Sequence, residues 1–528
     1  MGSSEFDNRS DGENDAMRYG NGSRTTRDDD YGDTERMALL EKKPLLQNKD
    51  NLKQRKPQGR WYVPKRYEIL FMVFVGNGLI YAMRINVSVT MAAMTNATYT
   101  TFDHDGSSNQ TVETCPKPNN SAESTNENGE FLWTAHQQEL IIAGFFYGYS
   151  VSQIPAGWLT DKIGGTRVFG FGMFISGISS LLGPTAAWMG PEFLLAVRIF
   201  CGFFEAGTMS SLGSIFSRWY SGDQNSHGLA IAMSGAKFGT FFGTIISGML
   251  SGTNFLGGWP STYYFFGTIT VTWALLWSVL IYESPHLHPR LSREEFEYLS
   301  SAAITEKTGK IAIPVKSMLL SIPVWAIIIC SFVGTWANNV VFTNQPIYLK
   351  NVQGMNIELI GILSSIPFLA EGGMLVLCSK LAIKLINDKT LSVVATRKIL
   401  TAIGLGLTAG SFLLLAYVGC NSALSVVLMI TATGFNGIAS SGYYVNLMDI
   451  APRFAGSLLG FVNTSSAISG ALTPYVIGVF TTNQADILGW QTVFFISTGL
   501  TLLAALVYTI LGSGEVQEWA KSSDEENL

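Results

Sequence analysis

Arg198 and Glu205 lie inside one long apolar stretch of the chain, which runs from Leu194 to Trp219. They are seven residues apart, close to two turns of an α-helix, so both side chains project from the same helix face. An arginine binds a carboxylate in a planar fork, and a glutamate in a poorly solvated site can hold a proton near neutral pH. One helix face could therefore serve an anion and a proton, or the two charges could neutralise each other and hold helices together.

The stretch that carries these two charges is long and apolar enough to cross a bilayer as a helix. A charge at membrane depth is expensive, so it is expected to face a partner or a water-filled cavity. Another apolar stretch, from Tyr67 to about Met94, contains Arg84 just past its middle and also Asn77. A guanidinium in a cavity suits the binding of an anion, and the alternative for Arg84 is a structural ion pair.

The composition is that of a membrane protein. Of the 528 residues, 47% are hydrophobic and 14% are charged, the mean hydropathy is +0.25, and the apolar residues fall in long runs. The net charge of −5 comes largely from polar tails and one loop, and it indicates no nucleic-acid partner. The sequence shows no nucleophile–base constellation, metal-ligand cluster or nucleotide-binding loop, so we expect no enzyme activity, no cofactor and no metal.

About twelve apolar stretches predict transmembrane helices. Six fall in the first half and six in the second: 67–94, 136–157, 167–189, 193–219, 227–250, 262–282, 322–345, 358–382, 398–418, 423–447, 455–480 and 490–511. The two sets, 67–282 and 322–511, flank a charged middle loop, 283–321. This pattern predicts an all-α membrane protein with two six-helix bundles, which would rock about a binding site near the membrane midplane.

Charges and glycosylation motifs agree on the orientation of these helices. A polar tail, 1–66, precedes the first span, and a short polar tail, 512–528, follows the last. Placing both tails in the cytosol puts nearly all lysines and arginines of the connecting loops on that side, as the positive-inside rule requires. The polar loop 95–130 then lies on the lumenal or extracellular side, and it carries three sequons at Asn96, Asn109 and Asn119.

The N-terminal tail contains two leucine pairs, and a glutamate precedes each of them. The pairs are Leu39–Leu40, which follows Glu35, and Leu45–Leu46, which follows Glu41. Acidic dileucine patterns on a flexible cytosolic tail resemble endosomal and lysosomal sorting signals, which sorting adaptors read. The alternative is an ordinary disordered tail, because the composition from residue 1 to about 66 is polar throughout.

The five cysteines show no spacing typical of a metal site. Cys201, Cys330 and Cys378 lie in apolar runs, where we expect them to act as small core residues. Cys115 and Cys420 fall in predicted exoplasmic segments. A disulfide between these two is one alternative, and two separate thiols are the other.

A short polar segment between the second and third predicted spans combines glycines with charges. Its marked positions are Gly157, Asp161, Lys162, Gly164, Gly165 and Arg167. Glycines tolerate positive φ and close helix approach in a tight turn, and Asp161 can cap a helix end or pair with a cation. The segment resembles the signature loop of the major facilitator superfamily, and this resemblance implies a structural and gating role for it.

Longer motifs resemble the anion/cation symporter family within that superfamily, which includes sialin, vesicular glutamate transporters and sodium/phosphate cotransporters. The resemblance covers roughly residues 67–519. Its motifs are Phe145-Phe-Tyr-Gly-Tyr, Glu205-Ala-Gly, Asn446-Leu-Met-Asp-Ile-Ala-Pro and Trp490-Gln-Thr-Val-Phe. The stretch Tyr81-Ala-Met-Arg-Ile-Asn-Val resembles the first span of the sialin-like members of the family.

The family resemblance implies roles for several polar side chains. Arg84 would bind the substrate carboxylate, and Glu205 would carry the coupled proton. Arg198 would be a second anion contact or the resting partner of Glu205. The remaining candidates would line the substrate cavity or serve as contacts between helices: Tyr147, Asn77 and Asn463.

The chain also departs from its relatives. Ile142 and Gly334 stand where vesicular glutamate transporters have a histidine and an arginine, which argues against glutamate as the main cargo. Cys201 stands where the sialin-like members have an acidic residue. Lys237 and Glu371 are additional charges inside predicted spans, and they could form a compensating pair or change the substrate and the proton coupling, with Glu371 as a proton-coupling candidate.

Together these features predict a proton-coupled symporter that exports sialic acid or a related small organic anion from the lysosome lumen by alternating access. The expected location is the membrane of lysosomes, endosomes or secretory vesicles, with the plasma membrane as an alternative. The expected partners are the anion, the proton, the lipid bilayer and the sorting adaptors. Three other functions remain open: vesicular uptake of acidic amino acids driven by membrane potential, sodium-dependent phosphate cotransport, and a non-transporting sensor.

Overall fold

The computed structural model describes residues 64–96, 115, 129–220, 223–304 and 314–521. These residues are largely helical, and the β-pairing among them is an isolated bridge between Thr95 and Phe131. The leucine pairs of the N-terminal tail and the sequons at Asn109 and Asn119 lie outside the described residues. The helices therefore confirm the all-α class that the apolar runs predict.

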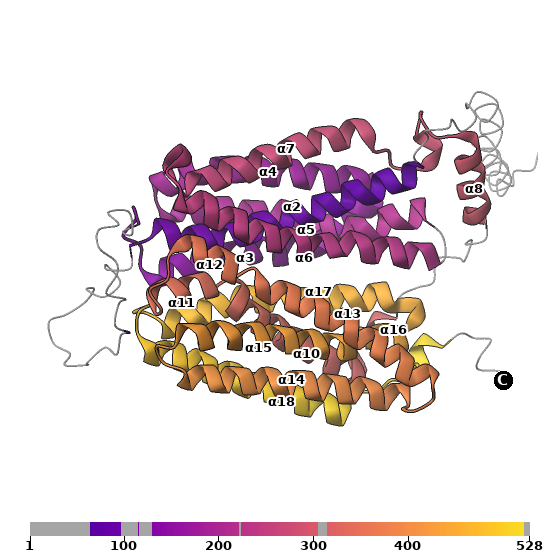
Figure 1. The fold of residues 1–528 in the computed structure, drawn as a ribbon. Coiled ribbons are helices and arrows are strands. Elements are labelled where there is room, and N and C mark those ends of the chain that lie inside the picture. The colour runs from indigo at the N-terminus through magenta and orange to yellow at the C-terminus, as the bar shows by residue number, and fades with distance from the viewer. Residues whose placement is uncertain (1–63, 97–114, 116–128, 221–222, 305–313, 522–528) are drawn as a thin grey trace, which may run out of the picture. The chain divides into compact units, whose positions relative to one another are not determined.

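Six long helices form the first half of the described chain (Figure 1). In chain order they are α2 (Lys65–Met94), α3 (Ala135–Ile163), α4 (Gly165–Met189), α5 (Pro191–Trp219), α6 (Asp223–Gly252) and α7 (Pro260–Leu280). Thr134 and Gln137 form a capping box that begins α3. Gly164 lies between α3 and α4, and Gly190 lies between α4 and α5. Their φ angles are 101° and 140°, and a residue with a side chain would be strained at either position.

Six further helical segments form the second half, and three of them are interrupted. They are α10 (Ile322–Phe342) with α11 (Gln345–Asn351), α12 (Ile357–Leu363) with α13 (Ile366–Asn387), α14 (Val393–Tyr417), α15 (Ser422–Tyr443) with α16 (Asn446–Ile450), α17 (Ala455–Phe480) and α18 (Ile487–Leu511). Pro346 and Pro367 lie in the first turns of α11 and α13. A proline lacks the N–H that an uninterrupted helix needs, so each helix starts afresh there.

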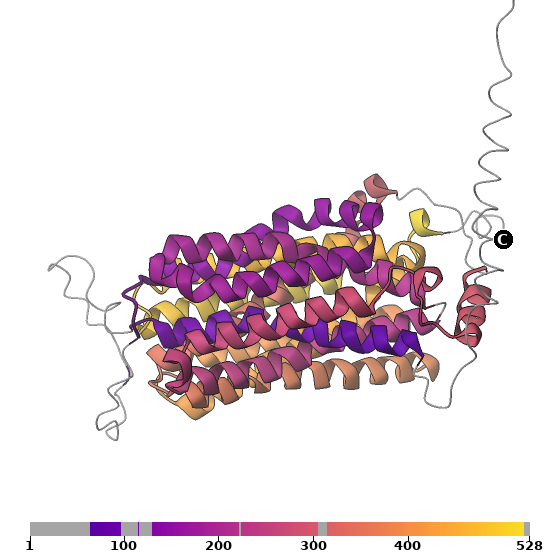
Figure 2. The ribbon, with the colours of Figure 1, turned by 90° about the horizontal axis from the view of Figure 1, so that it is seen from above.

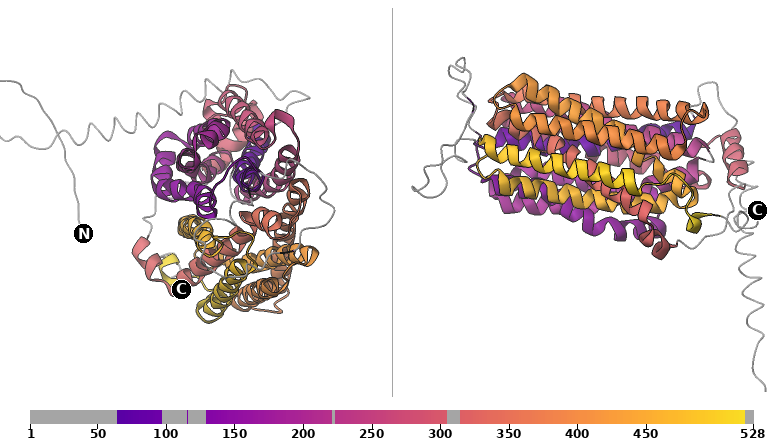
Figure 3. Two further views of the ribbon diagram at one scale, coloured as in Figure 1. Left: turned by 90° about the vertical axis from the view of Figure 1, so that its left-hand side faces the viewer. Right: turned by 90° about the horizontal axis from the view of Figure 1, so that it is seen from below.

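Nine helical segments of the described chain are long and apolar enough to cross a membrane, judged by length and composition. The helices α3, α6 and α17 are of similar length but more polar, so their passage through a membrane stays a prediction. The long helices run alongside one another (Figure 2). The view along them in the left panel of Figure 3 shows α2–α7 grouped on one side and α10–α18 on the other.

The charged segment 283–321, predicted as a loop, contains short helices among its described residues. They are η3 (Pro285–Leu287), α8 (Arg293–Ile304) and α9 (Val315–Leu320). The first turn of α8 carries Glu294 and Glu295, which suits the positive end of the helix dipole. These helices follow the membrane-length helix α7, and they are too short to span a bilayer themselves.

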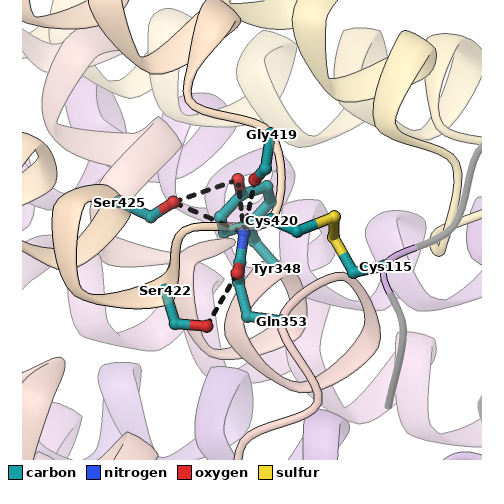
Figure 4. Close-up of a disulfide and its surroundings, with 7 residues drawn as sticks. All are labelled: Cys115, Tyr348, Gln353, Gly419, Cys420, Ser422 and Ser425. Carbon is teal, nitrogen blue, oxygen red and sulfur yellow. Dashed lines mark hydrogen bonds between the residues drawn. A yellow bond between two sulfur atoms is a disulfide. The ribbon is translucent and has the colours of Figure 1, made fainter. Parts of the chain in front are cut away.

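Cys115 and Cys420 form a disulfide, with their Cα atoms 5.4 Å apart (Figure 4). Cys115 follows α2 and Cys420 lies between α14 and α15, so the bond links the first half of the chain to the second. Beside it, Gln353 Nε2 donates to the carbonyl of Gly419 at 3.0 Å, and Ser422 Oγ donates to Gln353 Oε1 at 2.8 Å. The pairing that the sequence left open is therefore present.

The disulfide lies at one end of the bundle and so distinguishes its two ends. We call the end where α2 ends and α3 begins the disulfide end, and the end where α2 begins and α18 ends the terminal end. Polar contacts join the two halves at the disulfide end. Ser88 Oγ donates to the carbonyl of Thr343, Gln484 Nε2 donates to Gln138 Oε1 at 3.2 Å, and Lys350 Nζ donates to the carbonyls of Ala92 and Thr95. We call this set of contacts the seam.

Candidate functional site

Arg84 on α2 and Glu205 on α5 form a buried ion pair within the first half. Arg84 Nε donates to Glu205 Oε1 at 2.7 Å, and Arg84 Nη2 lies 2.6 Å from the same oxygen. The side chains are 11% and 1% exposed, so neither charge is well solvated. The partner of Glu205 in this structure is therefore Arg84, and not Arg198 as one of the sequence-based alternatives had it.

Aromatic rings surround the Arg84 guanidinium. Its Cζ atom lies 4.8 Å from the centre of the Tyr81 ring, 4.5 Å from that of Phe145 and 5.2 Å from that of Tyr149. Ring faces attract a cation, and they do so more strongly when water is excluded. Arg84 is thus held by cation–π contacts that do not depend on Glu205, which allows the guanidinium to stay in place when its carboxylate partner changes.

Glycines let the helices around this pair approach closely. A Cβ atom at Gly148 would lie 1.9 Å from the carbonyl oxygen of Ile199, and one at Gly202 would lie 1.9 Å from that of Phe145. The contact of α3 with α5 therefore requires glycine at both positions, and it places the Phe145 ring beside the charged face of α5. On α6, a Cβ at Gly239 would likewise meet the α2 backbone at 2.0 Å, so this glycine also serves close packing.

Arg198 lies on the same helix as Glu205 but has no carboxylate partner among the described residues. It is 8% exposed, and its Cζ atom lies 5.2 Å from the centre of the Phe145 ring. Its Nε atom is buried without a hydrogen-bond partner. Together, Arg84, Arg198 and an ionised Glu205 carry a net charge of +1 around one phenyl ring. A buried cation without a partner is costly, so this cluster is suited to bind an anion.

Glu205 has neutral partners besides Arg84. Its Oε2 atom accepts a hydrogen bond from Ser176 Oγ at 3.3 Å, and the Cys201 Sγ atom lies 4.0 Å away. Cys201 stands one turn before Glu205, where the sequence resemblance expected an acidic residue. The thiol leaves Glu205 as the one carboxylate of this described cluster, so a single carboxyl group here can exchange a proton.

A second ion pair joins the two halves. Lys237 Nζ on α6 donates to Glu371 Oε2 on α13, and Asn338 Nδ2 on α10 donates to Glu371 Oε1 at 2.8 Å. The Lys237 side chain is 40% exposed and that of Glu371 is 9% exposed. The structure thus brings together the two unexpected charges that the sequence offered as a compensating pair.

The other predicted cavity residues lie on three helices, α2, α3 and α17. Asn77 Nδ2 donates to the carbonyl of Ala232 at 2.9 Å and links α2 to α6, which is the interhelical role raised as its alternative. Tyr147 and Asn463 are partly buried on α3 and α17, two helices that pack against each other. Their predicted role at the substrate remains a proposal.

The glycine-rich segment between α3 and α4 is held by a glutamate that sequence reasoning missed. Glu283 accepts hydrogen bonds from the backbone N–H groups of Gly165, at 2.9 Å, and Thr166, at 3.0 Å, and it also pairs with Arg218. It therefore caps α4 at the terminal end. Glu283 begins the charged middle segment of the sequence, and its neighbours there gave no sign that it belongs to the signature loop.

The marked residues of this segment have different environments. Gly164 adopts its positive φ beside the Glu283 carboxylate, which a Cβ atom would approach to 2.4 Å. Lys162 Nζ lies 4.8 Å from the centre of the Trp158 ring, and Arg167 is exposed. A Cβ atom at Gly157 would have open space around it, with Ser210 Oγ, 3.9 Å away, as its nearest neighbour. The side chain of Asp161 lies outside the described part of the chain.

The second half has an ion pair at its own terminal end. Arg397 Nε donates to Asp449 Oδ2 at 2.7 Å, and Arg397 Nη1 donates to the carbonyl of Ser441 at 3.2 Å. Arg397 is 6% exposed, so this pair fixes α14 against α15 and α16. Asp449 belongs to one of the motifs that carry the family resemblance, whereas its partner could not be identified from the sequence.

The chain is similar to known membrane transporters along most of its length. Residues 70–474 match the family model described as Major Facilitator Superfamily. Human sialin is 33% identical over 457 residues, which are 86% of this chain and 90% of sialin. A putative inorganic phosphate cotransporter of Drosophila melanogaster is 32% identical over 465 residues, 87% of each chain.

Further comparisons agree with this. Vesicular glutamate transporter 3 of Danio rerio is 31% identical over 475 residues, 88% of this chain and 77% of its own. Among solved structures, a bacterial homolog of the human lysosomal transporter Spinster superposes with a TM-score of 0.67 at 14% identity, covering 88% of this chain and all of that one. The protein is therefore a multi-pass membrane transporter of the major facilitator superfamily, and it belongs to the anion/cation symporter family of which sialin is a member.

Proposed function

We propose that the protein is a proton-coupled symporter that carries sialic acid or a related small carboxylated anion out of the lumen of lysosomes or related vesicles. The observation that carries this proposal is the buried cluster of two arginines and one glutamate around Phe145. The similarity to sialin over most of the chain supports the choice of cargo.

The cluster suggests how a proton and an anion are coupled. While Glu205 is ionised, it holds Arg84 and competes with any carboxylate for that guanidinium. A proton on Glu205 removes this competition, so that Arg84 and Arg198 both become available to the anion. After the halves rock, loss of the proton to the cytosol restores the Arg84–Glu205 pair and expels the anion.

The ion pair between the halves belongs to the same cycle. Lys237 and Glu371 come from opposite halves, so rocking of the halves must stretch or break their contact. We assign Glu371 a proton-coupling role through this pair, because its protonation would release Lys237. Asn338 donates to the other oxygen of Glu371 and would hold the carboxyl group in place during the exchange.

The contacts of the seam support the view that the structure represents the cytosol-facing state of the transport cycle. These contacts lie at the disulfide end, and in the proposed orientation this end faces the lumen, with both chain termini and the middle segment 283–321 in the cytosol. The loop 95–130 would then be glycosylated at Asn96, Asn109 and Asn119. Adaptors would read the leucine pairs at 39–40 and 45–46 on the cytosolic tail.

The environment of Gly334 supports a cargo other than glutamate. A Cβ atom at Gly334 would lie 2.5 Å from the hydroxyl of Tyr443 and 3.2 Å from Asn436 Oδ1, and Tyr443 is 4% exposed. The arginine that vesicular glutamate transporters carry at this position has no room here. A cargo other than glutamate is therefore the better match for this site.

Uptake of radiolabelled sialic acid tests the proposal. Replacing Leu39, Leu40, Leu45 and Leu46 with alanine should bring the protein to the cell surface, where the medium takes the place of the lumen. We expect uptake that is stimulated by acidic medium and independent of sodium. Uptake of phosphate that requires sodium, or of glutamate driven by voltage alone, would favour the alternatives. Surface protein that carries none of these anions at either pH would contradict a transport function for them.

A further inference from the structure

Glu139 is a buried carboxyl group that the proposed mechanism does not use. It lies in the second turn of α3 at the disulfide end and is 1% exposed. Its side chain packs on α17, where a Cβ atom at Gly478 would lie 3.0 Å from the Glu139 Cβ atom. Its carboxyl oxygens face the side chain of Asn344, which stands between α10 and α11 and is fully buried. Glu139 therefore joins α3 of the first half to two elements of the second.

The Asn344 amide can face Glu139 in two orientations. With its nitrogen toward Thr343, the Asn344 amide donates to Thr343 Oγ1 at 2.7 Å, and that hydroxyl donates its hydrogen to the carbonyl of Asn339 at 2.7 Å. The amide oxygen then faces the two carboxyl oxygens of Glu139 at 3.0 and 2.5 Å. Two acceptors cannot bond, so this arrangement requires a carboxylic acid that donates to Asn344.

The opposite orientation of the amide directs the Asn344 nitrogen at both carboxyl oxygens of Glu139. It lets the Asn344 nitrogen donate to an ionised Glu139, but the amide oxygen then needs the single hydroxyl hydrogen of Thr343. That hydrogen then leaves the carbonyl of Asn339, which keeps its bond from the Thr343 backbone N–H at 2.9 Å. Asn344 is therefore the polar partner of the Glu139 carboxyl group in either orientation, and the burial of this carboxyl group and its lack of a cation favour the acid form.

The charged and titratable groups near Glu139 do not compensate a carboxylate. His136 lies one turn earlier on α3, and its ring contacts Tyr475 of α17, with centroids 6.2 Å apart. Lys350 on α11 donates to the carbonyls of Ala92 and Thr95 in the seam. Arg198 on α5 lies against the Phe145 ring. The ion pairs found among the described residues do not include Glu139, and a carboxylate buried without a cation is strongly disfavoured against its neutral form.

We propose that Glu139 is a proton-binding site of the seam, occupied while the disulfide end is closed and emptied when that end opens to water. An open disulfide end exposes the carboxyl group, which then exchanges its proton with the solution on that side. Closure buries it against Asn344, without an ion-pair partner among the described residues, and so favours the acid form. A proton from that side is therefore taken up whenever the seam closes, in addition to any proton on Glu205. This deepens the proposed function, because lumenal acid would then favour the cytosol-facing state without substrate.

Thiol labelling of the purified full-length protein, without substrate, tests this site directly. Ala92 is 2% exposed, and its carbonyl is part of the seam, so Ala92→Cys places a thiol that becomes accessible when the seam opens. The labelling rate is measured at acidic and neutral pH and divided by that of Glu192→Cys, an exposed position at the start of α5. Labelling of the protein without either added cysteine gives the background from the native thiols.

The expected result is a relative labelling rate at least roughly tenfold higher at neutral than at acidic pH in the wild-type background. In the Glu139→Gln background, the neutral side chain should keep the rate low at both pH values, while Glu297→Gln, at an exposed position of α8, should leave the wild-type difference unchanged. A difference that survives Glu139→Gln, or that disappears in His136→Gln instead, would overturn the proposal. Labelling involves no transport, so a failure of sialic acid uptake would leave this result standing.

Discussion

Arg84 and Arg198 lie against the same ring of Phe145, yet their partners differ. Arg84 has a carboxylate and three aromatic faces, whereas Arg198 has one ring and a buried Nε without an acceptor. Arg84 thus has an ionic partner in the absence of substrate, whereas Arg198 has none among the described residues. We infer that Arg198 attracts the anion. Arg84 binds the anion firmly once protonation of Glu205 has released its guanidinium.

Arg84→Lys tests the need for a planar, bidentate donor. An ammonium group keeps the charge, but it cannot form two parallel bonds to a carboxylate and fits the aromatic surroundings less well. The initial rate of acid-stimulated sialic acid uptake, normalised to surface protein, should fall by at least about tenfold. Arg293→Lys is the matched control, because Arg293 is an exposed residue of α8. Wild-type uptake in Arg84→Lys would exclude a fork at this position.

His288 lies outside the membrane-length helices, and its burial makes the stability of the protein depend on pH. Its ring is 2% exposed against Trp219 and Tyr282, and its Nδ1 atom accepts a hydrogen bond from the Arg290 N–H at 3.1 Å. Burial, helped by the charges of Lys65 and Arg290, lowers the pKa of His288 from 6.5 to about 4. The unfolded chain therefore binds more protons than the folded one between these two pH values.

The sign of this effect follows from proton linkage. The contribution of His288 to the free energy of unfolding is fully present above about pH 6.5. It decreases as the pH falls toward about 4, by up to about 1.4 kcal/mol per pH unit. His288→Gln removes the titrating group, so the thermal unfolding midpoint should decrease less between neutral and acidic pH than in the wild type. An equal acid-induced decrease in both proteins would show that other groups dominate in this range.

At the scale of elements, the apolar runs predict the positions of the long helices well, but not their interruptions. A run such as 358–382 satisfies the length of a span and was predicted as one helix, although Pro367 within it marks the start of α13 after the end of α12. The pairing of Lys237 with Glu371 was foreseeable because two unexpected charges inside spans need each other. The pairing of Arg84 with Glu205 was not, because periodicity within one helix says nothing about a partner on another.

Glu283 links three elements, and its replacement should loosen them together. Glu283 follows α7 in the chain. Its carboxylate caps α4 and pairs with Arg218 at the end of α5. Glu283→Gln removes the charge from these bonds, and we expect a loss of about 1–3 kcal/mol in stability, seen as a lower thermal unfolding midpoint. Arg218→Gln should cost less, because Arg218 is 38% exposed at its side chain. A larger loss from Arg218→Gln would contradict the capping role.

At the scale of the whole molecule, the disulfide joins two halves that the proposed cycle moves against each other. Cys115 follows α2 and Cys420 follows α14, so the bond must travel with the rocking or limit it. The sequence placed both cysteines on one side of the membrane but could not pair them, since a separation of 305 residues is bridged only by the fold.

Variants of the two cysteines test this bond. Cys115→Ala, Cys420→Ala and the double variant should lower the thermal unfolding midpoint by equal amounts, because each breaks the same covalent link. The expected cost is about 2–5 kcal/mol. A double variant that is clearly less stable than either single variant would indicate that the two cysteines act separately in the cell.

Proton coupling through Glu205 is the central claim, and one measurement addresses it most directly. Protein exposed at the cell surface is tested for acid-driven net uptake of labelled sialic acid and, in parallel, for exchange of labelled against unlabelled anion. In Glu205→Gln we expect net uptake driven by acid to be lost and exchange to persist, with Glu192→Gln unchanged in both. Full acid-driven uptake by Glu205→Gln would contradict the assignment of the coupled proton to this residue.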